Sequence, residues 1–197
     1  HHPLMNCAWH KVQHVTAEDA QGRIITTLLR NGISAICMHT NLDAAEGGVN
    51  DALAEKLGLN DIKALTEEKN GRVGMLKCEK PLVEFIQDVI KYLGCNGLRY
   101  TDCGKPVHRV AVGGGACGVY ISQAVALGCD TFVTSDLSYH EFLDAKALNL
   151  IDAGHFPTEN VICPVILERL QAAFPQLTVV QSTVHDREVI QYCIKEK

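Results

Sequence analysis

The stretch "LIDAGHFPTE" places an imidazole and a carboxylate, His155 and Glu159, four positions apart on either side of Pro157. It includes the end of a short apolar run that is typical of a buried strand. Pro157 suits the first position of a helix, and the helix dipole favours an acidic residue such as Glu159 in the first turn. The two side chains are therefore either incidental to a helix start or two ligands of a metal ion, and the stretch alone leaves both interpretations open.

Similar side chains follow other predicted strands. Loops at the carboxyl ends of strands in an open α/β sheet converge on one site, so these residues are the candidates for chemistry. Three of four strand ends combine His with a carboxylate, a donor set that suits Zn, Mn, Fe or Co. Ordinary turn formation also explains Asn and Asp at such positions. The candidates are His39, Asn41 and Asp43 after 32–38, Ser135, Asp136 and His140 after 131–134, and Asp152, His155 and Glu159 after 148–152.

The fourth strand end carries a glycine-rich turn, Gly113-Gly114-Gly115-Ala116-Cys117-Gly118. Such a turn could present backbone N–H groups to a phosphate, but it does not match G-x-G-x-x-G in its usual context and has no GK[ST]. The alternative is a tight turn that lets the backbone approach the site closely. Cys117, at the start of the next predicted helix, is the best candidate for a nucleophilic thiol, since that position lowers the pKa of a thiol.

Short apolar runs alternate with helical patterns along the chain, which predicts an α/β fold with a largely parallel sheet. A polar, charged stretch between about 60 and 72 is a candidate subdomain boundary. The predicted strands are 32–38, 72–81, 108–112, 131–134, 148–152 and 178–182, and the predicted helices cover 49–57, 81–94, 119–127, a segment that begins near Tyr139 and a segment after His155.

Composition limits the classes of protein. The chain has 197 residues, of which 47% are hydrophobic and 21% charged, enough for one large domain or two small ones. The net charge of −5 and the lack of a Lys/Arg cluster argue against nucleic-acid binding, and no apolar run reaches membrane-spanning length. The nine cysteines are scattered, without zinc-knuckle or redox-pair spacing. We expect free thiols in a reducing cytoplasm.

Five segments recur in a characteristic order: His1-His2-Pro3-Leu4, "HTNLDAAEGGVNDALAEKLGL" (39–59), "AVGGGACG" (111–118), "TSDLSYHEFLDA" (134–145) and "DAGHFPTE" (152–159). Together they resemble the Nif-three-like family of dinuclear-metal proteins, whose members often carry the name GTP cyclohydrolase type 2 homologue. The resemblance covers nearly the whole chain. It implies two divalent ions (Zn, Fe, Mn or Co) and five metal ligands, namely His1, His2, Asp43, His155 and Glu159.

The resemblance also implies an architecture of two interleaved α/β lobes with largely parallel or mixed sheets and the metal site in the crevice between them. We assign 1–68 to the N-terminal part of this fold and 69–197 to its C-terminal α/β part. The family implies a toroidal homohexamer with its sites facing the inner cavity. Ser135 stands where the family commonly has glycine. The sequence does not include the family's usual strand and helix before His-His-Pro, or the domain that larger relatives carry inserted between about 60 and 106.

We therefore expect a metal-dependent hydrolase that acts on a small substrate, phosphorylated or nucleotide-like. Two metal ions would lower the pKa of a bridging water and polarise the scissile group. His140 or Asp136 would act as an acid/base or orient a metal ligand. The alternative is a non-catalytic metal-binding protein with a regulatory or chaperone-like role, which acts through a protein partner.

Overall fold

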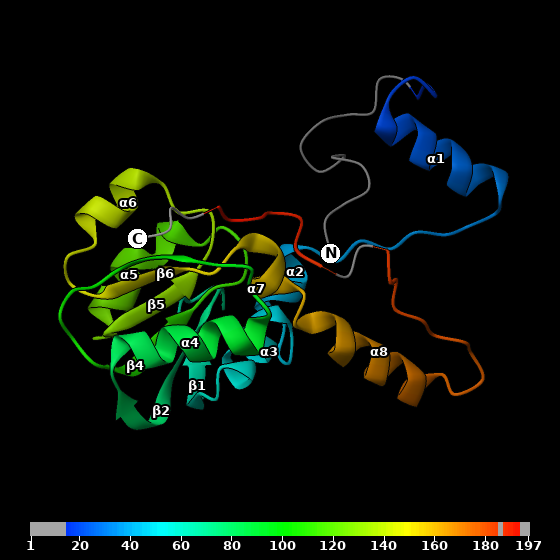
Figure 1. Cartoon of the computed structure of the whole chain (residues 1–197). Coiled ribbons are helices and arrows are strands. Elements are labelled where there is room, and N and C mark those ends of the chain that lie inside the picture. The colour runs from blue at the N-terminus through cyan, green and yellow to red at the C-terminus, as the bar shows by residue number, and fades with distance from the viewer. Residues whose placement is uncertain (1–14, 185–186, 194–197) are drawn as a thin grey trace. The chain divides into compact units, whose positions relative to one another are not determined.

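The computed structural model describes residues 15–184 and 187–193. The chain divides into two compact units, residues His1–Leu42 and Asp43–Lys197, called unit 1 and unit 2 below (Figure 1). Each is described by itself. The candidate ligands His1 and His2 lie outside the described residues, so the prediction for them stays a prediction.

Unit 1 contains helix α1, Ala20–Arg30, which begins after Asp19. The carboxylate of Asp19 accepts a hydrogen bond from Gly22 N at 2.6 Å and caps the helix. The predicted strand over 32–38 is wrong. Residues 33–39 have no regular secondary structure, and Ile36 is 86% exposed. A strand satisfies its backbone groups on a neighbouring strand, and none of the described strands pairs with this segment.

Unit 2 is built on one mixed sheet of six strands, in the order β1-β2-β4-β5-β6-β3. The α/β prediction is confirmed, but the sheet is less parallel than expected. Strands β4, β5 and β6 run parallel, whereas the pairs β1–β2, β2–β4 and β3–β6 are antiparallel. The strands are β1 Asn60–Ala64, β2 Arg72–Lys80, β3 Arg99–Thr101, β4 Val107–Val112, β5 Thr131–Thr134 and β6 Asn149–Asp152.

The register of the parallel strands places three loops at one edge of the sheet. Val112 of β4 lies opposite Val133 of β5, and Thr134 of β5 lies opposite Asp152 of β6. The carboxyl ends of these strands are therefore level with one another. The glycine turn after β4, the loop after β5 and the turn after β6 all leave the sheet at this edge, where α/β proteins bind ligands.

The helices of unit 2 follow the predicted pattern. Helix α4 repeats apolar residues at Leu82, Phe85, Ile86 and Val89 and ends at Gly94, whose φ is 68°. Ser138 and Glu141 form a reciprocal capping box at the start of α6, which agrees with the predicted helix start near Tyr139. The helices are α2 Thr40–Ala44, which spans the junction of the two units, α3 Val49–Lys56, α4 Leu82–Leu93, the 3-10 turn Gly118–Tyr120, α5 Ile121–Ala126, α6 Tyr139–Asp144, α7 His155–Glu159 and α8 Ile162–Ala173.

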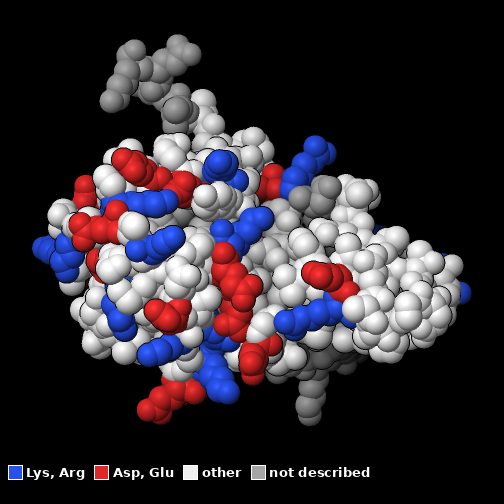
Figure 2. Space-filling view, turned by 90° about the horizontal axis from the view of Figure 1, so that it is seen from below, with Lys and Arg blue, Asp and Glu red and all other residues white. Residues whose placement is uncertain are grey.

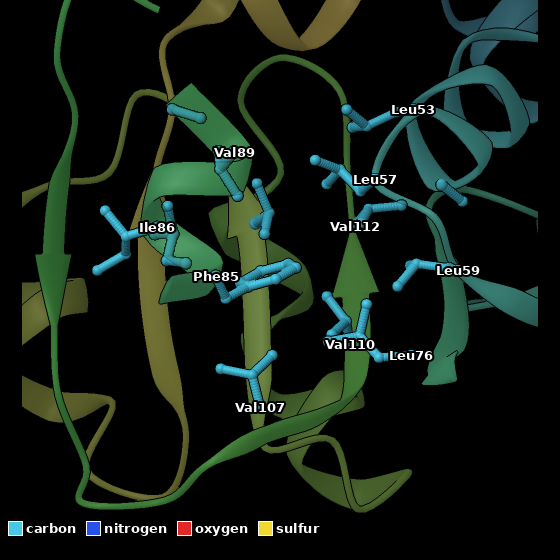
Figure 3. Packing of buried hydrophobic residues seen from close by; sticks show 14 of the residues in the cluster. Leu53, Leu57, Leu59, Leu76, Phe85, Ile86, Val89, Val107, Val110 and Val112 are labelled. Carbon is cyan, nitrogen blue, oxygen red and sulfur yellow. The ribbon is translucent and has the colours of Figure 1, made fainter. Parts of the chain in front are cut away.

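Two apolar layers hold these helices on the sheet. Strand β4 alternates, so that Val110 and Val112 face one layer and Ala111 faces the other. On the first face, Phe85 of α4 and Leu53 of α3 meet β4 (Figure 3). On the second face, α5 and α6 cover the sheet through residues that include Ala124 and Phe142. Buried apolar surface on both faces stabilises the sheet that carries the site loops.

Three parts of the strand pattern differ from the prediction. Residues 178–182 form no strand, and Val180 is 78% exposed. The polar strand β1 and the short edge strand β3 were not predicted. Strand β1 pairs with β2 as an antiparallel hairpin, and the candidate boundary between about 60 and 72 falls within this hairpin. The division into 1–68 and 69–197 as parts of the family fold stays a prediction.

None of the helices in the described part of the chain is long and apolar enough to span a membrane. Figure 2 shows acidic and basic side chains intermingled on the left and in the centre of the face in view, and few charged side chains on its right.

Candidate metal centre

The turn after β6 delivers His155 and Glu159 together. Gly154 adopts φ 89°, and helix α7 begins directly at His155 and ends at Glu159. The helix therefore starts two residues before Pro157, earlier than predicted. Residues four apart lie on the same side of a helix, and His155 Nε2 is 3.1 Å from Glu159 Oε1. The Thr158 hydroxyl is within hydrogen-bonding distance of the Gly154 carbonyl, at 2.9 Å, which holds the turn.

The loop after β5 supplies a second carboxylate to the same imidazole. Asp136 Oδ2 accepts a hydrogen bond from His155 Nδ1. Asp136 has a φ of 55°, a left-handed conformation that Asp adopts more readily than most residues. Ser135 N donates to the Gly115 carbonyl at 3.0 Å, and Leu137 N donates to Asp152 Oδ2 at 3.1 Å. These bonds on either side of Asp136 fix the loop, so the carboxylate is held against the His155 ring.

The glycine turn lies directly against this pair. Gly115 has a φ of 67°, and a Cβ there would overlap Glu159 Oε1 and lie 3.1 Å from His155 Nε2. Gly115 N donates to the Thr158 hydroxyl at 3.0 Å, and the Thr134 hydroxyl donates to the Gly115 carbonyl at 3.0 Å. Close approach of the backbone to the site, one of the two sequence interpretations, is therefore what this turn provides.

The same turn is not built as a phosphate cradle. Gly113 N donates to the Val133 carbonyl at 2.9 Å, and Gly114 N donates to Asn50 Oδ1 at 2.9 Å. Gly115 N is taken by Thr158, as described above. A phosphate-binding turn keeps such N–H groups directed at its ligand. Here protein groups already accept from the N–H groups of Gly113, Gly114 and Gly115, which argues against phosphate binding by this part of the turn.

Asp43 lies near the glycine turn as well. It is the first residue of unit 2, and its carbonyl accepts a hydrogen bond from Asn50 Nδ2 at 3.0 Å. Burial, together with the negative charges of Asp43 and Glu159, raises the pKa of the Cys117 thiol to about 12. Both carboxylates are therefore close enough to Cys117 to act on it. The weaker interpretation of Cys117 as a low-pKa nucleophile is therefore not supported, because burial and these two charges outweigh its position before a short helix.

The charge of His155 depends on its neighbours. The pKa of His155 is raised from 6.5 to about 9 by Glu159 and, to a smaller extent, by Asp136, while burial opposes the shift. In the absence of another cation, His155 is therefore protonated at neutral pH and balances part of the surrounding negative charge. A metal ion bound at His155 would take the place of a proton on the ring.

The other candidates lie elsewhere or have other partners. His140 is exposed on α6, where its ring meets the edge of the Tyr139 ring. Asp152 is buried, pairs with Arg99 and accepts from the backbone of the loop after β5, so it has a structural role. His39 and Asn41 belong to unit 1. The described residues contain no group of three or more His, Cys, Asp or Glu side chains arranged to hold a metal ion.

Sequence reasoning missed the polar side chains that support the site, Asn50, Thr134 and Thr158. All three are buried, with exposures of 0–1%. Asn50 stands second in the predicted helix 49–57, between Val49 and Asp51, where a polar residue is ordinary, so no local signal marked it. Thr134, a polar residue at the end of an apolar strand, gave a weak signal.

Comparisons with known proteins agree with this fold. A family model described as Duf34/NIF3 (NGG1p interacting factor 3) matches residues 1–188, and the chain belongs to this family. A Clostridium perfringens protein named "GTP cyclohydrolase 1 type 2 homolog" is 33% identical over 182 residues, which cover 87% of this chain and 68% of that protein. A Nostoc protein of the same name is 31% identical over 204 residues, covering 99% and 76% of the two chains.

Solved structures of other proteins share this fold. The Bacillus cereus protein related to NIF3 matches with a TM-score of 0.87 at 23% identity, covering 98% of this chain and 82% of that one. This likeness shows the fold alone. Reduced HcgD from Methanocaldococcus jannaschii matches with a TM-score of 0.72 at 29% identity, covering 87% and 68% of the two chains.

Replacing Gly115 by Ala tests the close approach of the turn to the site. Gly128 is the matched control, since it has a φ of 71° and a Cβ there would meet nothing within 4 Å. Gly128→Ala should cost about 1–2 kcal/mol for the left-handed backbone. Gly115→Ala should cost at least about 1 kcal/mol more, because its Cβ overlaps Glu159. Urea unfolding of chelator-treated protein measures the loss of stability in each variant. Equal losses would contradict the close packing of Gly115 against Glu159.

The pKa of His155 gives a test that depends on pH. A raised pKa means that the ion pairs of His155 stabilise the metal-free fold fully below pH 6.5 and are lost as the pH rises through about 9. In Asp136→Asn, the pKa of His155 should fall because one carboxylate partner is gone. Asp144→Asn, which changes an exposed residue of α6, should leave it unchanged. NMR titration of the His ring protons after chelator treatment reads this directly, and an unaltered His155 pKa in Asp136→Asn would rule out the pairing.

Proposed function

We propose that the chain is a metal-dependent hydrolase with a dinuclear centre held by His1, His2, Asp43, His155 and Glu159. The observation that carries the proposal is the pair His155 and Glu159, held side by side against Gly115 at the carboxyl edge of the parallel strands. Family membership supports it, since the sequence resemblance implies this ligand set. Two divalent ions, of Zn, Fe, Mn or Co, would be the cofactors.

The described donors fit such ions in their chemistry. Imidazole nitrogen and carboxylate oxygen are ligands that these borderline divalent cations prefer. Asp43 and Glu159 both act on the Cys117 thiol, which supports a common position at the glycine turn. Asp43 or Glu159 could bridge two ions. When bound, the ions would supply Lewis acidity, which lowers the pKa of water and polarises the bond to be cleaved.

The chain's own residues have separate roles in this proposal. Asp136 accepts from His155 Nδ1 and so orients the ring, leaving Nε2 on the side of Glu159. Asp136 or the exposed His140 would move a proton during hydrolysis. The substrate would be a small molecule, phosphorylated or nucleotide-like. The printed name of the bacterial relatives, "GTP cyclohydrolase 1 type 2 homolog", supports a substrate of this class.

A second candidate function is a non-catalytic metal-binding protein that regulates or chaperones a partner. The observation that favours it is the description of the family model, NGG1p interacting factor 3, which names a protein interaction. In that case protein side chains would close the metal site, whereas a catalytic site keeps a position open. The homohexamer implied by the sequence resemblance is part of both proposals.

Metal content and turnover separate these proposals. Elemental analysis of untreated protein should find about two metal ions per chain. Asp43→Ala should bind less metal and lose hydrolysis in a screen of phosphoesters and nucleotides, and the exposed control Asp144→Ala should retain both. Turnover no faster than that of Asp43→Ala would contradict the hydrolase, and full metal content without turnover would favour the second function. Wild-type protein without metal, even after reconstitution, would contradict both.

A further inference from the structure

Asn50 connects two parts of the candidate site that are far apart in the sequence. It is the second residue of α3 and is 1% exposed. Its Oδ1 accepts a hydrogen bond from Gly114 N at 2.9 Å, and its Nδ2 donates to the Asp43 carbonyl at 3.0 Å. One side chain therefore joins the backbone of a proposed ligand to the glycine turn.

This connection needs an amide. A buried N–H and a nearby carbonyl must each find a partner, and Asn offers both an acceptor and a donor on one short, planar group. An alanine would leave both backbone groups without the partner they have here. Each such buried group costs free energy, so the turn and the Asp43 backbone would move to recover a hydrogen bond.

The next residue of α3 holds the segment 45–48, which connects α2 to α3. Asp51 Oδ2 accepts from Gly47 N at 2.6 Å and from Arg72 Nη2 at 3.0 Å. Arg72, which is 5% exposed, also donates to the Ala45 carbonyl at 3.0 Å. Ala45 and Gly47 are held in this way, and Asn50 holds the backbone just before them, at Asp43 in helix α2.

The other end of the connection leads to the remaining ligands. Gly114 precedes Gly115, which lies against Glu159 Oε1 and His155 Nε2. A Cβ on Gly114 itself would lie 3.6 Å from Glu159 Cγ. A shift at Asn50 would therefore move the Asp43 backbone and the wall behind Glu159 together.

From this geometry we infer that Asn50 is a positioning residue that sets the Asp43 carboxylate relative to the His155–Glu159 pair. The inference rests on the proposed metal centre and adds the residue that fixes the position of Asp43 relative to His155 and Glu159. A residue of this kind acts through the ligands it orients, and its loss typically weakens metal binding about 10- to 100-fold.

Asn149 offers a matched control. It is 0% exposed, and its Nδ2 donates to the Lys105 carbonyl at 3.0 Å while its Oδ1 accepts from Cys103 N at 3.0 Å. It begins β6, at the end of the sheet away from the ligand loops. Asn149→Ala thus removes a buried amide with the same two kinds of bond, but far from the site.

The experiment compares Asn50→Ala, Asn149→Ala and the wild-type 197-residue chain after chelator treatment, with Co²⁺ as the probe. Titration calorimetry gives the affinity, the visible absorption of Co²⁺ reports the ligand geometry, and urea unfolding gives the midpoint of each metal-free protein. Both variants should lower the unfolding midpoint. Asn50→Ala alone should weaken Co²⁺ binding by about tenfold or more and change the spectrum.

Equal Co²⁺ affinity and identical spectra in Asn50→Ala and wild type would overturn the inference while the metal centre stands. An equal loss of affinity in both variants would overturn it as well, because general destabilisation would then be the cause. Wild type that does not bind Co²⁺ would overturn the proposed centre itself. If Asn50→Ala does not fold, Asn50→Ser takes its place, since a hydroxyl can keep one of the two hydrogen bonds and the same affinity loss is expected.

Discussion

The arrangement of this protein depends on one constraint, the concentration of negative charge beside a single imidazole. Asp136 accepts a hydrogen bond from His155 Nδ1, Glu159 Oε1 lies 3.1 Å from His155 Nε2, and the charges of Glu159 and Asp43 both raise the pKa of the Cys117 thiol. Carboxylates gathered in a partly buried place require a positive charge near them. In the metal-free chain the proton on His155 supplies part of it, which is why the pKa of that residue rises to about 9. A divalent cation would supply more charge at the same place.

The sheet and its turns hold these charged side chains close together at one edge of the sheet. Parallel pairing of β4, β5 and β6 brings three loops to one edge, and the two apolar layers keep the strands in register. The glycine turn then comes close to the ligands only because its own N–H groups are satisfied by Asn50 and Thr158. The buried polar network thus gives the backbone N–H groups of the turn their hydrogen-bond partners. Rigid support of this kind is what a binding site needs in order to hold its ligands in a fixed arrangement.

Much of this fold was predictable from local patterns. The apolar repeat of α4, the Ser138 cap of α6 and the positions of β4, β5 and β6 all follow from residues close in the sequence. The segments 32–38 and 178–182 have the same apolar character as real strands, and only the absence of a pairing strand among the described residues distinguishes them. Strand β1 shows the reverse case, a polar segment that becomes a strand because β2 offers it an edge.

The candidate site, like the fold, was predictable from the sequence only in part. Residue types after the strands predicted that His155, Glu159 and Asp136 would meet. They could not predict the high pKa of Cys117, because burial and the charges of residues distant in the sequence set it. The role of Asn50 was also hidden, since an amide shows its two partners only when the turn and the Asp43 backbone are both in place.

The central claim is that these carboxylates and His155 gather to bind metal. A crystal structure of the 197-residue chain grown with Zn²⁺ or Co²⁺, with anomalous diffraction collected at the metal absorption edge, tests it most directly. The claim predicts anomalous density within coordination distance of His155 Nε2 and the Glu159 carboxylate, about 2.0–2.2 Å, with Asp43 among the ligands. Anomalous density confined to other side chains, with His155 still bonded to Asp136 and Glu159 as in the metal-free chain, would contradict it.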